Sequence, residues 1–582
     1  MIRLESPFTA GRALLLAVFG LSLSLIAGFL VPVYSDEIGW RFQERAARDG
    51  VDILFSDLCG PNTLARPFWY MMPARWFSAI SNQMLASPLF VRVEGVLCAS
   101  GWAGLLWMLL AKLEPDRSRR QWIGMLSYLL LGLGSLPYIL VLSRPEQPLI
   151  LTTILILIVV FVRPPAITSR GETALKALAI ICLSAVAQSY HLKGVPYAGI
   201  AFLAIAVCAQ GGATLAPRLT GMGILALMTM TSAHYWADRL KCPGDAKLAA
   251  MYAGENLVAG LSGGVDSIGI LGRALKGADP FNYVFLATPI PEPMSDWLPH
   301  GLFSPAVSVA FLFALMIFWG LALVATAFAL GQFLLERRIR ALADPRFVLA
   351  AALLGVFAIW GGSQLKRNVY EAGHMLPVLI LAMVLSLTLP TARRTHLIGW
   401  LGHFGKIALP VSLIGQAIMI GTLAIPLWRT LSRPGYIQDQ PFSVSISGYA
   451  GITSDIRRAM VGAGIPLRGP LYRPMIDDLT YLALQDSRLP LHRLGVLSTW
   501  NGRIQDPVAY LHDQRSDGVI VGCHFLSGDL REAATPSGVV CAVSRQTIDR
   551  LFRQRRQRAD RKRRSARSTP NMALPPSTFE LG

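Results

Sequence analysis

Long apolar runs, separated by short polar segments, dominate the chain. A run of 18 or more apolar residues can cross the roughly 30 Å hydrocarbon core of a bilayer as a helix. The first predicted span is Gly11–Val33, which we interpret as a membrane helix because no small-x-small cleavage site of a signal peptide follows it. Ten further spans are predicted at about 89–112, 122–142, 146–163, 174–191, 195–211, 218–236, 304–335, 347–363, 370–390 and 405–428. The pattern predicts an all-α polytopic membrane protein with about 11 transmembrane helices.

Composition supports this class. Of the 582 residues, 53% are hydrophobic and only 15% are charged, whereas soluble domains carry about 25% charged residues. The mean hydropathy is +0.47. These values exclude a soluble enzyme, a collagen-like chain and a disordered chain.

Basic residues predict the orientation of the spans. The formal net charge is +19, and much of the excess lies in alternate loops such as LEPDRSRRQ, ERRIRALADPR and TARRTHLIGWLGHFGK. Cytoplasmic loops collect Lys and Arg. We therefore expect a multi-pass protein of the cytoplasmic (inner) membrane with its N-terminus inside and its C-terminal domain outside.

Three segments are too long to be simple connections. Residues 34–88 form a first external loop with amphipathic pieces, and residues 237–303 form a second. Residues 1–430 would be the membrane module, 431–550 an external soluble α/β domain, and 551–582 a basic tail. The tail is predicted to be a disordered, solvated segment, with attraction to anionic lipid headgroups as the alternative; no nucleic-acid partner is expected.

Two cysteines lie in short apolar runs that are typical of neighbouring strands. Cys523 is in VIVGCHF and Cys541 in VVCAVS. A disulfide between them is compatible with an oxidising compartment, and two buried free thiols are equally compatible with the pattern.

Charged residues gather at the predicted external ends of the spans. Asp36 and Glu37 follow the first span, and a carboxylate pair there can accept a proton or hold a cation. The other candidates follow or precede later spans: Arg144, Glu146, His191, Lys193, Lys366, Arg367, Tyr370, Glu371 and His374. Placing charged groups inside or beside membrane spans costs free energy. Arg and Lys at such positions suit a phosphate-bearing ligand. For each residue singly, snorkelling or an ion pair between helices explains the position equally well.

With its acidic pair after the first helix, its cationic helix ends and its C-terminal domain, the sequence resembles the GT-C fold of integral membrane glycosyltransferases. These include protein mannosyltransferases and aminoarabinose transferases, which use polyprenyl-phosphate sugar donors. The resemblance covers roughly residues 10–430 in architecture but only Asp36-Glu37 in motif. No WWDYG-like motif occurs in the tail, which favours transfer to a lipid or surface polysaccharide over protein glycosylation.

The resemblance implies a role for each candidate. Asp36 would be the general base, and Glu37 would orient the acceptor or a divalent cation. The cationic candidates, with His191 and His374, would bind the donor phosphate. Membrane lipids, the polyprenyl-phosphate-linked sugar and a lipid or glycan acceptor are the expected partners. Trp40, Trp69, Tyr70 and Trp76 would stack on sugars or form an interfacial belt.

Two other motifs and two other functions are compatible with parts of the sequence. Ser262–Ser267, SGGVDS, matches a pyrophosphate-binding loop but lies in a segment with no room for the required α/β domain. Asp477 and Asp478 suit the first turn of a helix better than a metal pair. The rival functions are a transporter or flippase of a lipid-linked saccharide, which would need charges deep in the bundle, and a non-catalytic envelope scaffold.

Overall fold

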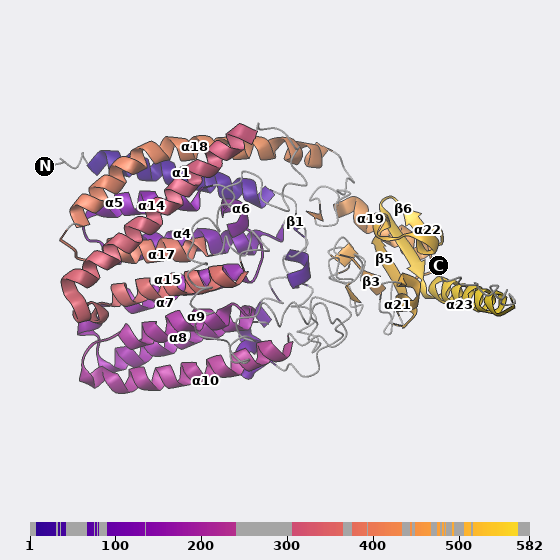
Figure 1. Ribbon diagram of the computed structural model, residues 1–582, viewed down its shortest axis with the longest axis horizontal. Helices are drawn as coiled ribbons and strands as arrows, with labels where there is room; N and C mark the ends of the chain where they lie inside the picture. Colours follow the sequence, from indigo (N-terminus) through magenta and orange to yellow (C-terminus); the bar gives the residue numbers. More distant parts are fainter. Residues whose placement is uncertain are drawn as a thin grey trace, which may run out of the picture. The chain divides into compact units, whose positions relative to one another are not determined.

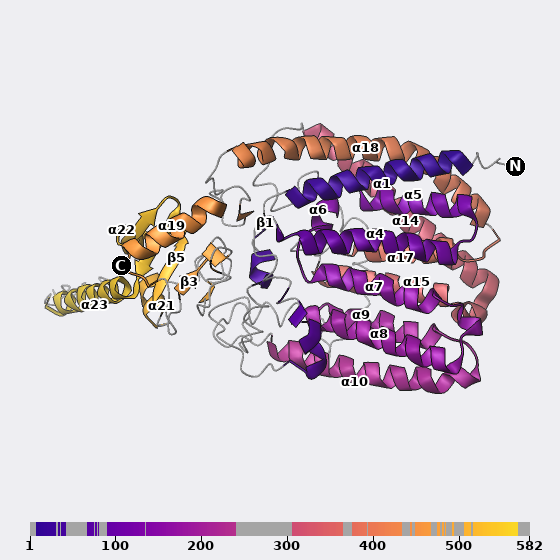
Figure 2. The ribbon, with the colours of Figure 1, turned by 180° about the vertical axis from the view of Figure 1, so that it is seen from behind.

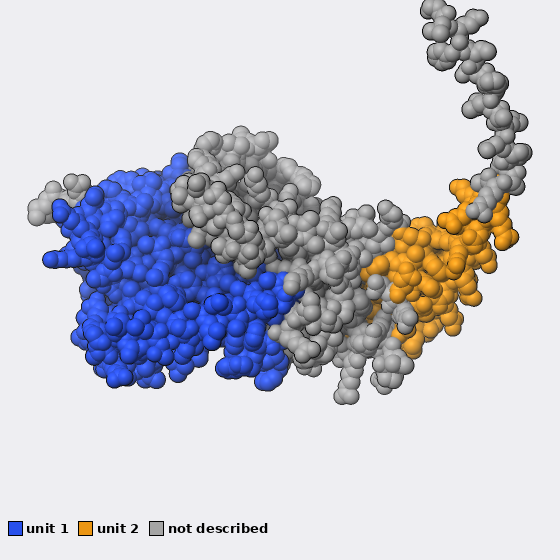
Figure 3. All heavy atoms as spheres, turned by 60° about the horizontal axis from the view of Figure 1, so that its bottom comes forward, with its two compact units in different colours: residues 1–448 blue, residues 449–582 orange. Residues whose placement is uncertain are grey.

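The computed structural model divides the chain into two compact units, residues 1–448 and residues 449–582 (Figure 3). The residues it describes are 7–30, 33–34, 37–41, 67–74, 76–77, 80, 90–133, 136–239, 305–364, 375–392, 394–432, 443–444, 449–466, 474–477, 480–481, 484, 492–493, 506–513 and 516–568.

The first unit is a bundle of helices that run side by side in alternating directions (Figures 1 and 2). Its long helices are α1 (Pro7–Leu30), α4 (Val93–Leu113), α5 (Arg117–Leu131), α7 (Glu146–Phe161), α8 (Arg170–Tyr190), α9 (Gly194–Val207), α10 (Leu215–Arg239), α14 (Pro305–Arg337), α15 (Pro345–Gln364), α17 (Leu376–Leu387) and α18 (Arg394–Ser432). The short helix α6 (Leu136–Leu140) continues the direction of the chain after α5.

Each of the eleven predicted spans overlaps one of these long helices. Five helices within the described residues are long and apolar enough to cross a membrane by themselves: α1, α4, α8, the α10 region and α14. The helices α7, α9, α17 and parts of α15 and α18 are shorter apolar helices. The membrane class is therefore supported, and the number of eleven crossings stays a prediction.

Apolar packing holds the bundle together. Helix α1 packs on α5 and α18, α4 packs on α7, and α8 packs on α7, α9 and α10. The shared core includes Trp102, Leu106, Ile154, Leu379 and Leu381, all almost fully buried. Side chains that face outward, such as Leu15, Phe19 and Leu227, remain largely exposed in the isolated chain. Apolar residues on both the core and the outer face are what a helix in lipid requires.

A small ladder closes the first unit. Strand β1 (Val33–Tyr34) follows α1 and pairs antiparallel with β2 (Ser443–Val444), which follows α18. The chain thus returns, more than four hundred residues later, to the segment just before the predicted acidic pair.

The second unit is a mixed α/β fold. Its sheet has the order β4-β3-β5-β7-β6, with β3 (Pro474–Ile476), β4 (His492–Arg493), β5 (Gly518–Gly522), β6 (Thr535–Ser537) and β7 (Val540–Ser544). The β3–β4 and β3–β5 pairs are parallel, and β5–β7 and β6–β7 are antiparallel. An α/β fold was predicted for this region.

Helices cover the two faces of this sheet. Helix α19 (Tyr449–Gly462) packs on β5, β6 and β7, and α23 (Arg545–Ser568) packs on β5, β7, α21 (Pro507–Asp513) and α22 (Gly528–Glu532). Val519 and Val521 of β5 join the cluster that contains Leu511 and Ile548. Side chains alternate along a strand, so Ile520 points to the α19 face.

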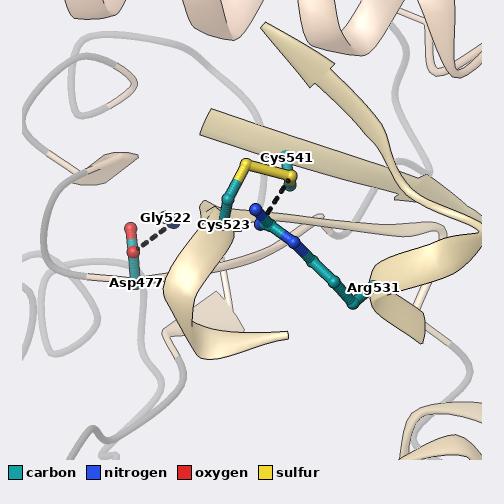
Figure 4. The surroundings of a disulfide bond; sticks show 5 residues. All are labelled: Asp477, Gly522, Cys523, Arg531 and Cys541. Atoms are coloured by element: carbon teal, nitrogen blue, oxygen red, sulfur yellow. Dashed lines mark hydrogen bonds between the residues drawn. A yellow bond between two sulfur atoms is a disulfide. The ribbon is translucent and has the colours of Figure 1, made fainter. Parts of the chain in front are cut away.

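Cys523 and Cys541 form a disulfide (Figure 4). The two predicted strands, β5 and β7, are indeed neighbours, with Val521 opposite Cys541. Of the two alternatives that the sequence left open, the structure has the disulfide.

The prediction of a disordered tail was wrong for much of its length. Residues 553–567 lie within α23, which extends to Ser568. Its first half is anchored by Ile548 and Leu551, which are buried in the core of the second unit. The composition of the tail did not indicate that it continues a packed helix, because the apolar residues that anchor this helix precede the basic run.

Candidate functional site

The candidate site lies where α1, α8 and α10 end and where α4, α7 and α9 begin. We call this end of the bundle the site end. Several predicted residues are brought together here by the alternating helix directions. Asp36, Lys366, Arg367, Tyr370, Glu371 and His374 lie outside the described residues, so their predicted roles remain untested.

Glu37 is buried in an ion pair with Arg92. Residues 37–41 are helical, and the Glu37 side chain is fully enclosed. Arg92 Nη2 lies 3.0 Å from Glu37 Oε2, and Arg92 Nε donates to both carboxylate oxygens at 3.2 Å. The backbone N–H of Ser143 donates to Glu37 Oε1 at 2.8 Å, and Arg92 Nη1 donates to the carbonyl of Gly28 at 2.8 Å.

These contacts give Glu37 a structural role, and we call Glu37 with its partners Arg92 and Ser143 the Glu37 joint. It ties the segment after α1 to the start of α4 and to the loop before α7. A carboxylate engaged in this way does not fit the ligand role for a divalent cation that the resemblance implies. Among the described residues, no group of three His, Cys, Asp or Glu side chains is placed to hold a metal.

A second cluster joins the beginnings of α7 and α9. Lys193 Nζ lies 2.6 Å from Glu146 Oε1, and Arg144 Nε lies 3.2 Å from Glu146 Oε2. Glu146 is 1% exposed and Lys193 3% exposed at the side chain. The predicted Arg144, Glu146 and Lys193 therefore share one buried network, in which a single carboxylate holds two cations.

His191 lies directly beside this network. The backbone N–H of Lys193 donates to His191 Nδ1 at 3.1 Å, which assigns the imidazole proton to Nε2. The ring is 6.1 Å from those of Trp40 and Trp236. Burial, followed by the charge of Lys193, lowers the pKa of His191 to about 3, with smaller contributions in the same direction from Arg144 and Arg239. His191 is therefore a neutral donor near physiological pH.

Arg239 extends the cluster from the end of α10. Its guanidinium lies 5.0 Å from the centre of the Trp236 ring, in a cation–π arrangement. The Trp236 indole N–H donates to the carbonyl of Gln188 at 2.9 Å, which fixes that ring. Three cationic side chains and one carboxylate thus act on His191, so the local field favours an anion.

Sequence reasoning missed Arg92, Trp236 and Arg239. Arg92 falls inside the predicted second span, and Arg239 lies just after the predicted seventh span, where it was counted with a long loop. Each of these residues lies at a helix end beside another helix end that carries a predicted site residue. That neighbourhood is the signal that could have identified them. Trp40 is half-buried beside His191, whereas Trp69 and Trp76 are exposed and Tyr70 bonds to Met228, Thr231 and Ser232 of α10.

An apolar cavity borders the same end of the bundle. It is lined by Leu21, Leu25, Cys98, Ala99, Trp102, Ala103, Leu131, Leu140, Gln147 and Ile150. Gln147 connects it to the cationic cluster, because its side-chain oxygen accepts the backbone N–H of Arg144 at 3.2 Å. Apolar space therefore lies next to the buried charges.

Asp477 has the structural role predicted for it. Its carboxylate accepts hydrogen bonds from the backbone N–H of Thr480 at 2.9 Å and from that of Gly522 at 2.7 Å (Figure 4). It therefore caps a helical turn and binds β5. Asp478 and Ser262–Ser267 lie outside the described residues.

No family model and no curated protein matches the chain. Solved structures are similar to it over most of its length. The apo structure of ArnT from Cupriavidus metallidurans is 13% identical with a TM-score of 0.45, and the similarity covers 92% of this chain and 98% of that one. The structure of the same protein bound to undecaprenyl phosphate has a TM-score of 0.42 at 12% identity, with the same coverage.

An oligosaccharyltransferase from Archaeoglobus fulgidus, in complex with zinc and sulfate, is also similar. It is 12% identical with a TM-score of 0.41, and the similarity covers 87% of this chain and 68% of that one.

Proposed function

We propose that the protein is a membrane glycosyltransferase that takes a sugar from a polyprenyl-phosphate donor. The acceptor would be a lipid or a surface polysaccharide on the outer face of the cytoplasmic membrane. The observation that carries the proposal is the network of Arg144, Lys193 and Arg239 around a neutral His191, next to an apolar cavity. One end of a lipid phosphate is anionic and the other is apolar, and the site end offers both environments.

In the proposed reaction, the cationic network stabilises the leaving group. The acceptor hydroxyl attacks the anomeric carbon, the bond from that carbon to the phosphate oxygen breaks, and polyprenyl phosphate leaves with the electron pair. Arg144 and Lys193 would stabilise the charge that develops on the departing phosphate, and His191 Nε2–H would donate a hydrogen bond to it. Because the donors are already fixed by neighbouring contacts, little reorganisation accompanies the reaction.

Asp36 would accept the proton of the acceptor hydroxyl. Its neighbour Glu37 is held by Arg92 and Ser143, so the backbone at the start of this segment is anchored. We assign Glu37 a positioning role and keep Asp36 as the proposed base.

The proposal is tested by mass spectrometry of envelope glycolipids and polysaccharides. Cells that lack the gene would carry the wild-type chain, Asp36→Asn or Lys193→Met, at equal membrane levels. We expect the wild type to restore a saccharide-bearing species, whose added mass identifies the sugar. Both variants should reduce its amount by about 100-fold or more, as the loss of a base or of an electrostatic stabiliser does.

The matched control is Glu532→Gln, which neutralises an exposed carboxylate of the second unit. It should restore the species fully. Equal restoration by all chains would contradict the proposed chemistry. If the variants instead accumulate the unreacted donor on the inner side of the membrane, transport would replace transfer as the function.

A further inference from the structure

The distal half of α23 is a strongly basic helical rod. From Arg553 onward it carries Arg553, Arg555, Arg556, Arg558, Arg561, Lys562, Arg563, Arg564 and Arg567, against the single acid Asp560. Residues 556–565 are helical and exposed. We propose that this rod is a docking surface for the anionic headgroups of a phospholipid bilayer.

The root of the rod is firmly attached to the second unit. Arg555 Nη1 lies 2.7 Å from Asp506 Oδ1, and Arg555 Nε lies 2.9 Å from Asp529 Oδ2. The same pairing lowers the pKa of Asp529, chiefly through its hydrogen bond with Arg555. The ring of Phe552 stacks on His512 with centroids 4.0 Å apart. The rod therefore continues a packed helix.

Basic residues surround the distal half of α23. At 3.6 residues per turn, Arg553, Arg556, Arg563 and Arg564 fall within an arc of about 100°, and Arg558, Arg561 and Lys562 lie outside it. Leu551 and Arg555, which face the core and the ion pairs, lie on the other side of the helix. Figure 1 shows α23 extending beyond the sheet. The basic arc is thus turned away from the second unit and is available to a partner.

The distal half has no apolar face with which to bind a protein groove or to insert into lipid. Its residues after Phe552 are almost all Arg, Lys, Gln, Asp, Ala or Ser. Like charges three and four residues apart destabilise a helix by roughly 0.2–0.5 kcal/mol per pair. A polyanionic surface that neutralises them would stabilise the helix, so binding and helix formation are coupled.

Two observations favour a bilayer over other polyanions. The second unit contains the Cys523–Cys541 disulfide, which forms in oxidising compartments, where nucleic acid is scarce. The same chain carries helices that are long and apolar enough to cross a membrane, so a lipid surface is always at high effective concentration. Each Lys or Arg near an anionic surface contributes about 1 kcal/mol, and salt screens the attraction.

The test is hydrogen–deuterium exchange of the full-length protein in nanodiscs. Discs of phosphatidylcholine would be compared with discs that also contain phosphatidylglycerol, at low and at high salt. We expect amides of residues 556–565 to exchange about tenfold more slowly in the anionic discs at low salt. High salt should abolish the difference, while β5 and β7 should exchange equally in every condition.

Two variants separate charge from folding. In the first, Arg556, Arg558, Arg561, Lys562, Arg563 and Arg564 are replaced by Gln, which keeps helix propensity and should remove the lipid effect. In the second, the five Arg of this set are replaced by Lys, which keeps the charge and should preserve it. Equal exchange of the wild type in both kinds of disc would overturn the proposal. So would protection by an oligonucleotide or an acidic oligosaccharide in phosphatidylcholine discs without protection by anionic lipid.

Discussion

At the scale of single residues, Glu37 illustrates how a motif changes its meaning in the fold. From sequence it is one half of a carboxylate pair that suits catalysis. In the structure both of its oxygens bond to Arg92, and one also accepts from the backbone of Ser143. Removing one partner of a buried ion pair leaves the other charge uncompensated, which is strongly destabilising.

We therefore expect Glu37→Gln to lower the free energy of unfolding by about 3–5 kcal/mol. The measurement is thermal unfolding of the purified protein in detergent. The double variant Glu37→Leu with Arg92→Met removes both charges and should recover much of the lost stability. A Glu37→Gln protein that unfolds like the wild type but transfers no sugar would show that Glu37 acts in catalysis.

His191 gives a prediction on pH. Its folded-state pKa of about 3 lies below the ordinary value of 6.5. Between these values the unfolded chain binds a proton that the folded protein excludes, so stability falls as the pH decreases from about 6.5 toward 3. We expect His191→Gln to reduce this acid sensitivity, measured as the change in unfolding temperature between pH 7 and pH 5.

If His191→Gln and the wild type lose the same stability on acidification, the imidazole is not kept neutral by its surroundings.

At the scale of elements, the close contact between α4 and α6 positions the Glu37 joint. A Cβ at Gly95, near the start of α4, would lie 2.2 Å from the carbonyl oxygen of Val141. Backbone cannot move away as the end of a flexible side chain can. Val141 lies two residues before Ser143, whose backbone N–H donates to Glu37. A displacement of Val141 would therefore also displace this hydrogen bond.

We expect Gly95→Ala to destabilise the protein and to lower transfer activity. Gly104, in the same helix, has no atom within 4 Å of the position of an added Cβ. The matched variant Gly104→Ala should therefore leave both stability and activity close to wild type. Unfolding temperature and glycolipid mass spectrometry measure the two effects. Equal behaviour of both variants would contradict the importance of this contact.

Elements also show where sequence patterns mislead. The run of basic residues after Arg553 is typical of a disordered tail, yet it continues a helix that begins with Arg545. The anchor is supplied by Leu551, Phe552 and the pairing of Arg555 with two aspartates on other elements. Local composition carries no information on such distant partners.

At the scale of the whole molecule, the alternating helices place five connections at the end of the bundle opposite the site end, each with Lys or Arg in the loop or in an adjoining helix turn. These loops connect α4 to α5, α7 to α8, α9 to α10, α14 to α15 and α17 to α18. The positive-inside rule predicts that this end faces the cytoplasm. The site end would then face outward.

Reporter fusions test this orientation. Alkaline phosphatase needs an oxidising compartment to form its disulfides. We expect it to be active when fused after Gly448 and inactive when fused after Ser169, between α7 and α8. Fusions of a cytoplasmic reporter at the same positions should give the opposite pattern. An active phosphatase after Ser169 would reverse the orientation and with it the proposed location of the reaction.

The sequence by itself determined the membrane class and the position of the long helices, and its basic residues predicted an orientation. These properties depend on the length and composition of contiguous segments, which a bilayer selects directly. It also nominated Arg144, Glu146, His191 and Lys193, because charged groups at apolar helix ends are costly and therefore conspicuous.

Only the tertiary structure decided which of these groups meet and what state each is in. The pairing of Glu37 with Arg92, the addition of Arg239 and Trp236, and the neutral state of His191 arise between elements far apart in the chain. Hydrogen bonds, burial and charge act over a few ångströms in space, whatever the separation in sequence. For that reason a pattern along the chain can indicate the candidates, whereas packing assigns their roles.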